Sequence, residues 1–270
     1  MTTGEAEIKH VAAAFDRQSK VFDEYEEANK ILLWMRLVIH RYMEKLVYPG
    51  QCLLDLNAGT GIDAVYFARH GVRVHAIDIS SGMLDKLRRK IAHENLLDLI
   101  SVQQLSFTKL DNLAGSGFDH IFSNFGGINC VSDVESVIKQ FDRILKPGGM
   151  VTLIVMPPIC PWEIMFMLKG NFELAFRRLR KGGASANVEG VRFTSHYFTP
   201  KMLIGSFSER YKLFSLRGLT SIFPPPYCDK FLSRYPRLFE RMKKWDEVAS
   251  THWPFRSWAD HFILTMQYQP

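Results

Sequence analysis

The chain has 270 residues, of which 47% are hydrophobic, 13% aromatic and 23% charged, a composition that suits one large α/β domain with a well-filled core. No apolar run is long enough to span a bilayer, and residues 1–5 lack the basic start and apolar core of a signal peptide, so we expect a cytoplasmic protein. The formal charge is +6, but the basic clusters are short and carry no RNA-binding signature, so we expect no nucleic-acid partner. The four cysteines lie far apart without C-x-x-C spacing, so neither a metal site nor a disulfide framework is expected.

The predicted elements begin with a helical region over residues 5–46, where apolar positions recur at helical spacing until Pro49-Gly50 ends it. Short apolar runs then alternate with amphipathic stretches, which predicts a parallel sheet with helices on both faces. The expected strands are residues 52–56, 72–77, 99–104, 118–123, 150–156, 211–219 and 262–267, and the expected helices between them are residues 62–70, 82–94, 133–145 and 199–209. An apolar segment over residues 157–198 follows the fifth strand and is expected to form a helical cap above the carboxyl edge of the sheet.

Two acidic residues and a glycine turn mark the first half of this sheet. The first strand leads into Asp55 and then Gly59-Thr60-Gly61, and the second strand ends in Asp78. About twenty residues between a glycine turn and an acid is the separation expected when adjacent parallel strands sandwich a helix, and it predicts a nucleotide-type cofactor at the carboxyl ends of the strands. Residues 59–64 also match the dinucleotide pattern G-x-G-x-x-G/A, so a nicotinamide oxidoreductase is an alternative. Asp55 argues against that alternative, because an upstream carboxylate repels a pyrophosphate.

The stretch from Asp55 to Gly61 resembles motif I of class I S-adenosyl-L-methionine (SAM)-dependent methyltransferases, with Asn57 where the first glycine is expected. Asparagine tolerates positive φ better than most residues, so the turn can survive this change. Lys146-Pro147-Gly148-Gly149 resembles the tetrad before the fifth strand of that family, so the resemblance covers residues 50–156. It implies a Rossmann-like, seven-stranded, mostly parallel sheet of order 3-2-1-4-5-7-6. It also implies a methyltransferase domain at residues 50–270, a helical lid at residues 1–49, SAM as cofactor and S-adenosyl-L-homocysteine as product.

The same resemblance implies roles for individual residues around the cofactor. Asp55 is expected under the methionine ammonium group, and Asp78 is expected to accept hydrogen bonds from the ribose hydroxyls. Residues 14–25 are similar to the lead-in of small-molecule methyltransferases of the quinone-biosynthesis type, where a helix folds over the cofactor. By that similarity Tyr25 is expected at the sulfonium and Arg36 at the carboxylate of SAM.

Adenine recognition is expected to depend on packing. Ser106 and Phe107 stand where many family members carry an acid that accepts from the adenine amino group, so the charge-assisted hydrogen bond is missing. The complete predicted cofactor set is Tyr25, Arg36, Asp55, Asn57, Ala58, Gly59, Thr60, Gly61, Asp78, Ile79, Met83, Ser106, Phe107 and Asn124.

The acceptor side is predicted from the cap. Methyl transfer from a sulfonium needs mainly positioning and exclusion of water, and a base only when the nucleophile arrives protonated. His196 and Tyr197, at the exit of the cap, are the candidates for acid–base catalysis. Because the cap is so apolar, it predicts a dry pocket for an apolar or aromatic acceptor, with these substrate-binding candidates: Phe125, Trp162, Phe166 and His261. Basic residues follow the apolar stretch, so peripheral membrane contact is an alternative that we rank below the pocket.

The sequence after the fourth strand argues against one class of methyl acceptor. Residues 123–129 read Ser-Asn-Phe-Gly-Gly-Ile-Asn instead of the Asn/Asp-Pro-Pro-Tyr type motif with which amino-methyltransferases hold a planar amino group, which argues against nucleobase or glutamine methylation. We therefore predict SAM-dependent methyl transfer to a small, largely apolar or aromatic acceptor, at oxygen or an activated carbon. N-methylation of a small amine and a non-catalytic methyltransferase-like scaffold are the alternatives.

Overall fold

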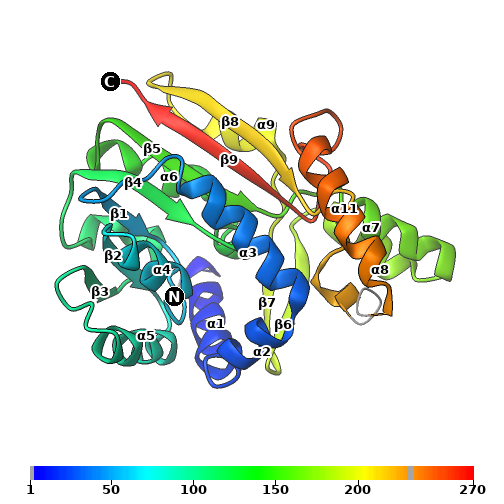
Figure 1. Ribbon diagram of the computed structural model, residues 1–270, viewed down its shortest axis with the longest axis horizontal. Helices are drawn as coiled ribbons and strands as arrows, with labels where there is room; N and C mark the ends of the chain where they lie inside the picture. The colour runs from blue at the N-terminus through cyan, green and yellow to red at the C-terminus, as the bar shows by residue number, and fades with distance from the viewer. Residues whose placement is uncertain (1–2, 230–233) are drawn as a thin grey trace.

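A seven-stranded sheet with strand order β3-β2-β1-β4-β5-β9-β8 forms the centre of the computed structural model, which describes residues 3–229 and 234–270 (Figure 1). Neighbouring strands are parallel from β3 to β5, and β9 is antiparallel to both β5 and β8. The predicted mostly parallel, Rossmann-like sheet is confirmed. Its order is the predicted 3-2-1-4-5-7-6, because β8 and β9 are the sixth and seventh strands of this sheet along the chain. The strands are β1 (Cys52–Asp55), β2 (Arg73–Asp78), β3 (Ile100–Gln104), β4 (Phe118–Ser123), β5 (Leu145–Val155), β8 (Tyr211–Leu219) and β9 (His261–Tyr268).

Both faces of the sheet are covered by helices, as predicted. Successive strand residues point to opposite faces, so Leu53 and Leu54 of β1 belong to two different apolar clusters. The cluster on the side of Leu53 includes α3 (Lys30–Met43), α4 (Ile62–Arg69) and α5 (Ser81–His93), and the other includes α6 (Val134–Ile138) and α9 (Pro200–Ser206). Short 3-10 helices complete the layers: η1 (Phe107–Asn112), η2 (Gly127–Cys130), η3 (Phe141–Arg143), η4 (Phe166–Lys169), η5 (Arg177–Leu179) and η6 (Pro226–Cys228).

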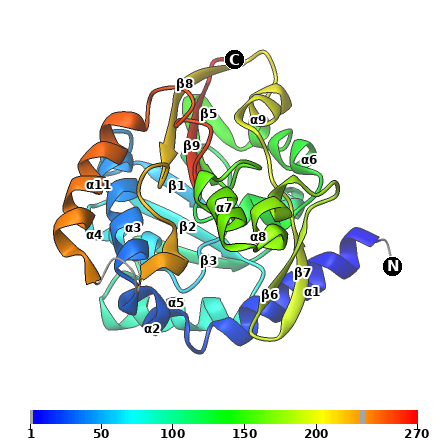
Figure 2. The ribbon, with the colours of Figure 1, turned by 90° about the vertical axis from the view of Figure 1, so that its right-hand side faces the viewer.

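The N-terminal region is helical, as predicted, but it has three helices with different surroundings. In α3 the side chains of Ile31, Met35 and Ile39 are fully buried in the same cluster as Leu53, so α3 is part of the domain core. The preceding helices, α1 (Thr3–Gln18) and α2 (Phe22–Ala28), lie at the carboxyl edge of the parallel strands (Figures 1 and 2).

A carboxylate fastens the end of α1 to the start of α5. Asp16 Oδ1 accepts hydrogen bonds from the Ser80 hydroxyl at 2.5 Å and from the backbone N–H of Gly82 at 2.9 Å. A negative charge at this position satisfies free N–H groups at a helix N-terminus and is favoured by the helix dipole. The C-terminal end of α1 is therefore fixed to the start of α5.

The insertion after β5 is helical only in its first half, which corrects the predicted helical cap over residues 157–198. It forms α7 (Pro161–Met165) and α8 (Phe172–Phe176), and then a separate antiparallel hairpin of β6 (Ala184–Val188) and β7 (Val191–Ser195). Glu189 and Gly190 join the strands with φ of 47° and 78°, the positive values that a two-residue hairpin turn requires. The hairpin lies alongside α1 (Figure 2).

Three further elements differ from the prediction. The helix expected over residues 133–145 is shorter, because α6 ends at Ile138 and only the 3-10 helix η3 follows it before β5. Strand β5 begins at Leu145, before the Lys146-Pro147-Gly148-Gly149 tetrad, and its register against β4 shifts there before the continuous ladder starts at Met150. Helix α11 (Pro236–Ala249) was not predicted. Its buried Asp246 accepts backbone N–H groups from residues 220–223, which joins α11 to the end of β8. Among the described helices, none is long and apolar enough to cross a membrane.

Candidate functional site

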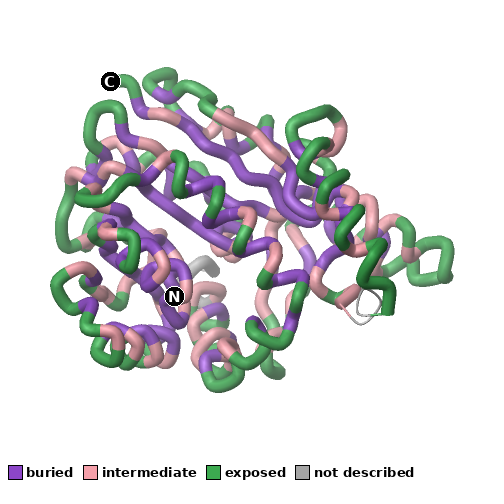
Figure 3. Tube along the Cα trace, viewed as in Figure 1, coloured by how far each residue is buried: buried purple, intermediate pink, exposed green. Residues whose placement is uncertain are grey.

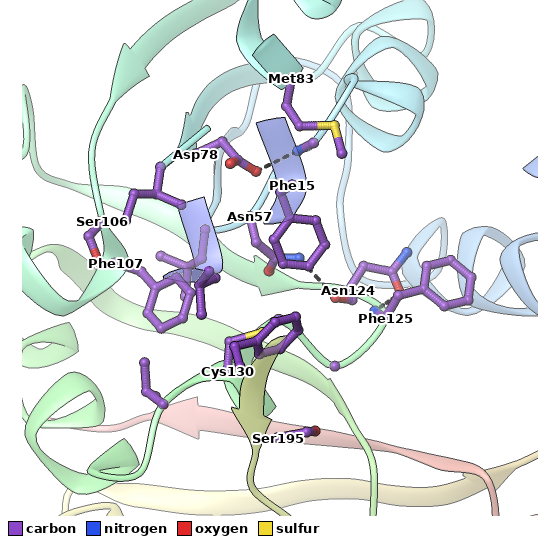
Figure 4. A pocket seen from close by; sticks show the side chains of 18 of the residues that line it. Phe15, Asn57, Asp78, Met83, Ser106, Phe107, Asn124, Phe125, Cys130 and Ser195 are labelled. Carbon is purple, nitrogen blue, oxygen red and sulfur yellow. Dashed lines mark hydrogen bonds between the residues drawn. The ribbon is translucent and has the colours of Figure 1, made fainter. Parts of the chain in front are cut away.

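A cavity of about 240 Å³ lies at the carboxyl edge of the parallel strands, which is the edge that the sequence predicts for the cofactor. One wall is built by residues that follow β1 to β5, so every parallel strand contributes to it. The opposite wall comes from α1, the start of α2 and the β6–β7 hairpin (Figure 4). The strand-end residues are Leu56, Asn57, Gly59, Asp78, Ile79, Met83, Ser106, Phe107, Asn124, Phe125, Gly126, Gly127, Cys130, Val131 and Met156, and the opposite wall is Ile8, Val11, Phe15, Phe22, Ala186, Phe193 and Ser195.

The glycine turn after β1 has the backbone geometry expected of a cofactor loop. Gly59 and Gly61 have φ of 56° and 83°, in the left-handed region that favours glycine. A Cβ on Gly61 would lie 2.1 Å from Leu87 Cδ1 of α5, so Gly61 allows close helix packing. Gly59 faces open space on the cavity wall, which leaves room for a ligand. Asn57 does not have positive φ, so the expected strain at that position is absent.

The Asp78 carboxylate lies on the cavity wall and is held in a fixed orientation by backbone hydrogen bonds. Its two carboxylate oxygens accept the backbone N–H of Ser80 at 2.8 Å and of Gly59 at 2.9 Å. Burial raises the pKa of Asp78 to about 6, and those two hydrogen bonds oppose the increase. Each oxygen retains a lone pair for a further donor, and the pair of oxygens matches the two hydroxyls of a ribose.

An apolar slot continues from Asp78. Ile79, Met83, Ser106 and Phe107 all lie on the cavity wall, as the sequence predicts. Ser106 Oγ accepts the backbone N–H of Thr108 at 3.3 Å and lies 2.8 Å from the Thr108 hydroxyl, so it caps η1. The serine hydroxyl is therefore already engaged, and the slot presents mainly apolar side chains to the cavity.

Asn57 closes the gap between β1 and β4. Its Nδ2 donates to the carbonyl of Asn124 at 2.9 Å, and its Oδ1 accepts from the Ser123 hydroxyl at 2.6 Å. Its side chain packs directly against Gly127 of the next loop. Asn57 and Asn124 both line the cavity (Figure 4).

Asp55 lies behind this wall and does not line the cavity, which corrects its predicted place under an ammonium group. It is 1% exposed, and its Oδ2 has no hydrogen-bond partner among the described residues. Burial and the neighbouring Asp63 carboxylate raise the pKa of Asp55 well above its usual range. Asp55 therefore lies in the core beneath the glycine turn, where burial disfavours its ionised form.

Tyr25 and Arg36 do not reach the cavity wall, and both predicted contacts with SAM need correction. The Arg36 guanidinium is buried between Glu26 Oε2 at 2.7 Å and Asp63 Oδ2 at 2.6 Å. Its charge is already neutralised by two carboxylates, so it is not available for a third. Tyr25 is 52% exposed on the outer side of α2.

Other residues of the predicted cofactor set support the loop from outside the cavity. Ala58 donates its backbone N–H to the carbonyl of Ile77. The Thr60 hydroxyl donates to Asp23 Oδ1 at 2.5 Å, and Lys90 Nζ lies 2.9 Å from the same oxygen, which joins α2 to the glycine turn and to α5.

The two residues predicted to act in acid–base catalysis have structural partners instead. His196 Nε2 lies 3.1 Å from Glu7 Oε1 of α1, and the Tyr197 ring lies under the Arg178 guanidinium, with its centroid 5.4 Å from Cζ. Neither residue lines the cavity. The pairing of His196 with Glu7 connects the hairpin exit to the helix that covers the site.

Three of the four predicted substrate contacts also lie outside the cavity. Trp162 donates Nε1–H to the carbonyl of Ile222, Phe166 packs on Tyr227, and His261 pairs with the neighbouring Asp260. Phe125 alone of the four lines the cavity, and its ring meets His261 edge-on at 6.1 Å.

The sequence argument missed the hydrophobic wall supplied by α1 and the hairpin. Phe15 and Phe193 face each other with ring centroids 6.0 Å apart, and Ile8 and Val11 extend the same surface along α1. Helical spacing of Ile8, Val11 and Phe15 was the available signal for this face. The hairpin half of the wall depends on a strand pair that the cap prediction did not contain.

Hydrogen exchange of α1 is expected to slow when S-adenosylhomocysteine binds. The inner face of α1 contacts the cavity, and local opening of such a cover is easier when nothing fills the space below it. Protection over residues 7–18 should rise with ligand, measured by mass spectrometry, whereas α3 should be equally protected in both states because it belongs to the core. Equal protection of α1 in both states would identify it as a fixed layer.

Comparison with known proteins agrees with this geometry. A family model described as a methyltransferase domain matches residues 53–149. A SAM-dependent Diels–Alderase of Talaromyces variabilis is 30% identical over 44% of this chain and 41% of its own length. A demethylmenaquinone methyltransferase of Thermobifida fusca is 32% identical over 54% of this chain and 60% of its own length. The chain thus spans less than two thirds of these relatives.

Solved structures share the fold across most of the chain. A SAM-dependent methyltransferase of Listeria monocytogenes superimposes with a TM-score of 0.61 at 16% identity, covering 85% of this chain and 96% of that one. The [4+2]-cyclase SpnF superimposes with a TM-score of 0.55 at 14% identity, covering 86% and 80%. The sheet order and the glycine turn with its acid agree with this match, so residues 53–149 form a methyltransferase domain with the fold of the class I SAM-dependent enzymes.

Proposed function

We propose that the chain transfers a methyl group from SAM to a small, largely apolar acceptor, at an ionised oxygen or an activated carbon. The observation that supports this most is the cavity itself, which joins the predicted cofactor edge to a wall of aliphatic and aromatic side chains from α1 and the hairpin. Such a wall excludes water and favours an acceptor with little charge. Among the relatives are demethylmenaquinone methyltransferases, whose name gives demethylmenaquinone, an apolar molecule, as the acceptor.

The adenosine half of the cofactor fits the residues present. Asp78 would accept the ribose hydroxyls, Gly59 would let the backbone approach the ligand, and Ile79, Met83 and Phe107 would enclose the adenine. Asn57 and Asn124 would limit the methionine end. Bound SAM supplies the activated methyl group, so the chain has to orient the acceptor and keep water out.

The cavity offers no strong base to the acceptor. Among the described lining residues, Asp78 and Cys130 are the titratable groups, and burial raises the pKa of the Cys130 thiol to about 12. With Asp78 assigned to ribose, an acceptor that arrives protonated has no nearby group to take its proton. The acceptor should therefore be acidic enough to ionise by itself, as a phenol or an enolisable carbonyl compound is, rather than a protonated amine.

A second candidate is catalysis of a ring closure with SAM retained. The described cavity-lining residues supply no strong base, and a pericyclic ring closure needs none because it transfers no proton. The Diels–Alderase relative and the cyclase with the same fold carry such names.

The test combines methyl-labelled SAM with a panel of phenols, enolisable 1,3-dicarbonyl compounds, amines and conjugated polyenes. Methyl transfer should occur to the ionisable acceptors, and the midpoint of the pH profile of kcat should follow the pKa of each acceptor. A midpoint common to all acceptors would reveal an enzyme base and contradict the proposal. Conversion of a polyene that needs SAM without consuming it would favour the second candidate, and absence of S-adenosylhomocysteine binding would exclude both.

A further inference from the structure

The first half of the insertion exposes an unusual number of large apolar side chains. Residues 165–181, here called the apolar tip, project from the sheet next to α11 and are mostly exposed (Figures 1 and 3). Leu168 is 81% exposed and Phe172 is 59% exposed. The six exposed large apolar residues of the tip are Met165, Met167, Leu168, Phe172, Phe176 and Leu179. These side chains therefore do not line the dry pocket that the apolar cap predicted.

The same segment is strongly basic. Residues 165–181 contain five basic residues and one acidic residue, Glu173. Lys169 and Lys181 are exposed at the two ends of the tip, and Lys169 Nζ lies 5.5 Å from the ring centroid of Phe166. Cations thus border the apolar side chains directly, which is the arrangement that suits a surface with anionic groups above an apolar layer.

A buried ionic network holds the base of the tip. Arg178 Nη2 lies 2.7 Å from Glu163 Oε1 and 2.6 Å from Asp260 Oδ1, and all three side chains are almost fully buried. Arg177 Nη2 adds a contact of 2.6 Å to Glu163 Oε1. This attachment to the start of β9 keeps the tip outside the core, so its apolar residues cannot fold back to bury themselves.

We propose that the apolar tip docks on an anionic lipid surface. Leu168 and Phe172 enter the boundary between headgroups and acyl chains, and Lys169 and Lys181 lie against lipid phosphates. A projecting tip with a cationic border fits between lipid headgroups better than it fits a flat protein surface. The chain continues from the tip directly into the hairpin that lines the cavity, so docking would bring the cavity close to molecules dissolved in the membrane. The inference does not depend on methyl transfer.

Flotation of the full chain with lipid vesicles tests the proposal. The protein should bind vesicles of phosphatidylcholine mixed with phosphatidylglycerol, bind pure phosphatidylcholine much less, and dissociate at high salt. The double variant L168E/F172E should lower the partition coefficient by at least about tenfold, because it replaces inserted apolar area by charge. K169Q and K181Q should each lower it by about fivefold, because each removes one lysine charge near an anionic surface.

The matched control is L97E, in the turn between α5 and β3, at the opposite end of the sheet from α8 (Figure 1). Leu97 is 74% exposed, so L97E adds one negative charge, half of that added by L168E/F172E, at a similar exposure and should leave vesicle binding unchanged. Absence of wild-type binding, or equal loss in L97E and L168E/F172E, would overturn the proposal. Self-association of the wild type that L168E/F172E abolishes, without vesicle binding, would identify a second copy of the chain as the occupant instead.

Discussion

Replacing Asp78 by alanine is expected to weaken binding of S-adenosylhomocysteine by about 2–4 kcal/mol, because two ribose hydroxyls lose a buried charged acceptor. The carboxylate lies on the cavity wall and is oriented by the N–H groups of Gly59 and Ser80. Titration calorimetry gives the affinity, and thermal unfolding shows whether the variant is folded. Asp85→Ala is the matched control on α5, because its exposed carboxylate pairs with Arg88 away from the cavity. Unchanged affinity in folded Asp78→Ala would place the ribose elsewhere.

The same affinity should depend on pH. Since the pKa of Asp78 in the folded chain is about 6, the carboxylate that accepts the hydroxyls is lost as the pH falls through that value. Affinity should rise from pH 5 to pH 7 and then level, and the rise should be absent in Asp78→Asn. The contribution of Asp78 to the free energy of unfolding has the opposite dependence on pH from that of ligand affinity. Because the folded pKa is above the ordinary one, the folded chain binds the proton more tightly, and the contribution of this group to stability decreases as the pH rises from about 4 to about 6.

Replacing Arg178 by methionine is expected to lower the free energy of unfolding by about 3–5 kcal/mol, because it leaves buried carboxylates without a partner. Arg178 donates to Glu163, to Asp260 and to two backbone carbonyls, and its side chain is 3% exposed. Methionine keeps most of the side-chain volume, so the loss reports the ionic contacts. Urea unfolding at neutral pH measures the change.

Arg180→Met provides the comparison for this second experiment. Arg180 is exposed and lies 3.4 Å from Glu173 on the surface, so its removal should cost at most about 1 kcal/mol. Similar losses in the two variants would show that the buried network contributes no more than a surface ion pair. Vesicle binding by the still-folded fraction of Arg178→Met would then indicate whether the apolar tip depends on its ionic base.

The parallel strands could be predicted because their signals are local, whereas the strand order was expected from the resemblance to class I methyltransferases. Each parallel strand of the sheet is an apolar run bounded by turn residues, and alternation with helices determines how such strands connect. The hairpin could not be predicted in the same way. Its strands carry few β-branched residues in an apolar context, and only the Glu189-Gly190 turn marked them. Helix α11 could have been predicted, because Phe239, Met242 and Asp246 recur at helical spacing after Pro236 in the first turn.

Site residues that directly follow a parallel strand could be predicted from the sequence. Residues whose side-chain direction depends on an ion-pair partner elsewhere in the chain could not. Asp78, Ile79 and Phe107 line the cavity because the carboxyl ends of parallel strands converge at one edge. Arg36 was expected to meet a ligand carboxylate, yet it meets those of Glu26 and Asp63. Helical position gives the side of a helix that a residue occupies, but it does not say which of several acids lies within reach.

The contact between Asn57 and Gly127 makes two distant positions of the chain interdependent. A Cβ on Gly127 would lie 2.3 Å from Asn57 Cγ and 2.6 Å from its Nδ2, and all three of its nearest atoms belong to that asparagine. The φ of Gly127 is not in the left-handed region, so the asparagine alone forbids a larger residue there. A glycine at position 57 would remove that restriction. Glycine is therefore required at position 57 or at position 127, but not at both. A comparison restricted to the loop after β1 would count Asn57 as a loss of the family motif, whereas Gly127 in the loop after β4 compensates for it.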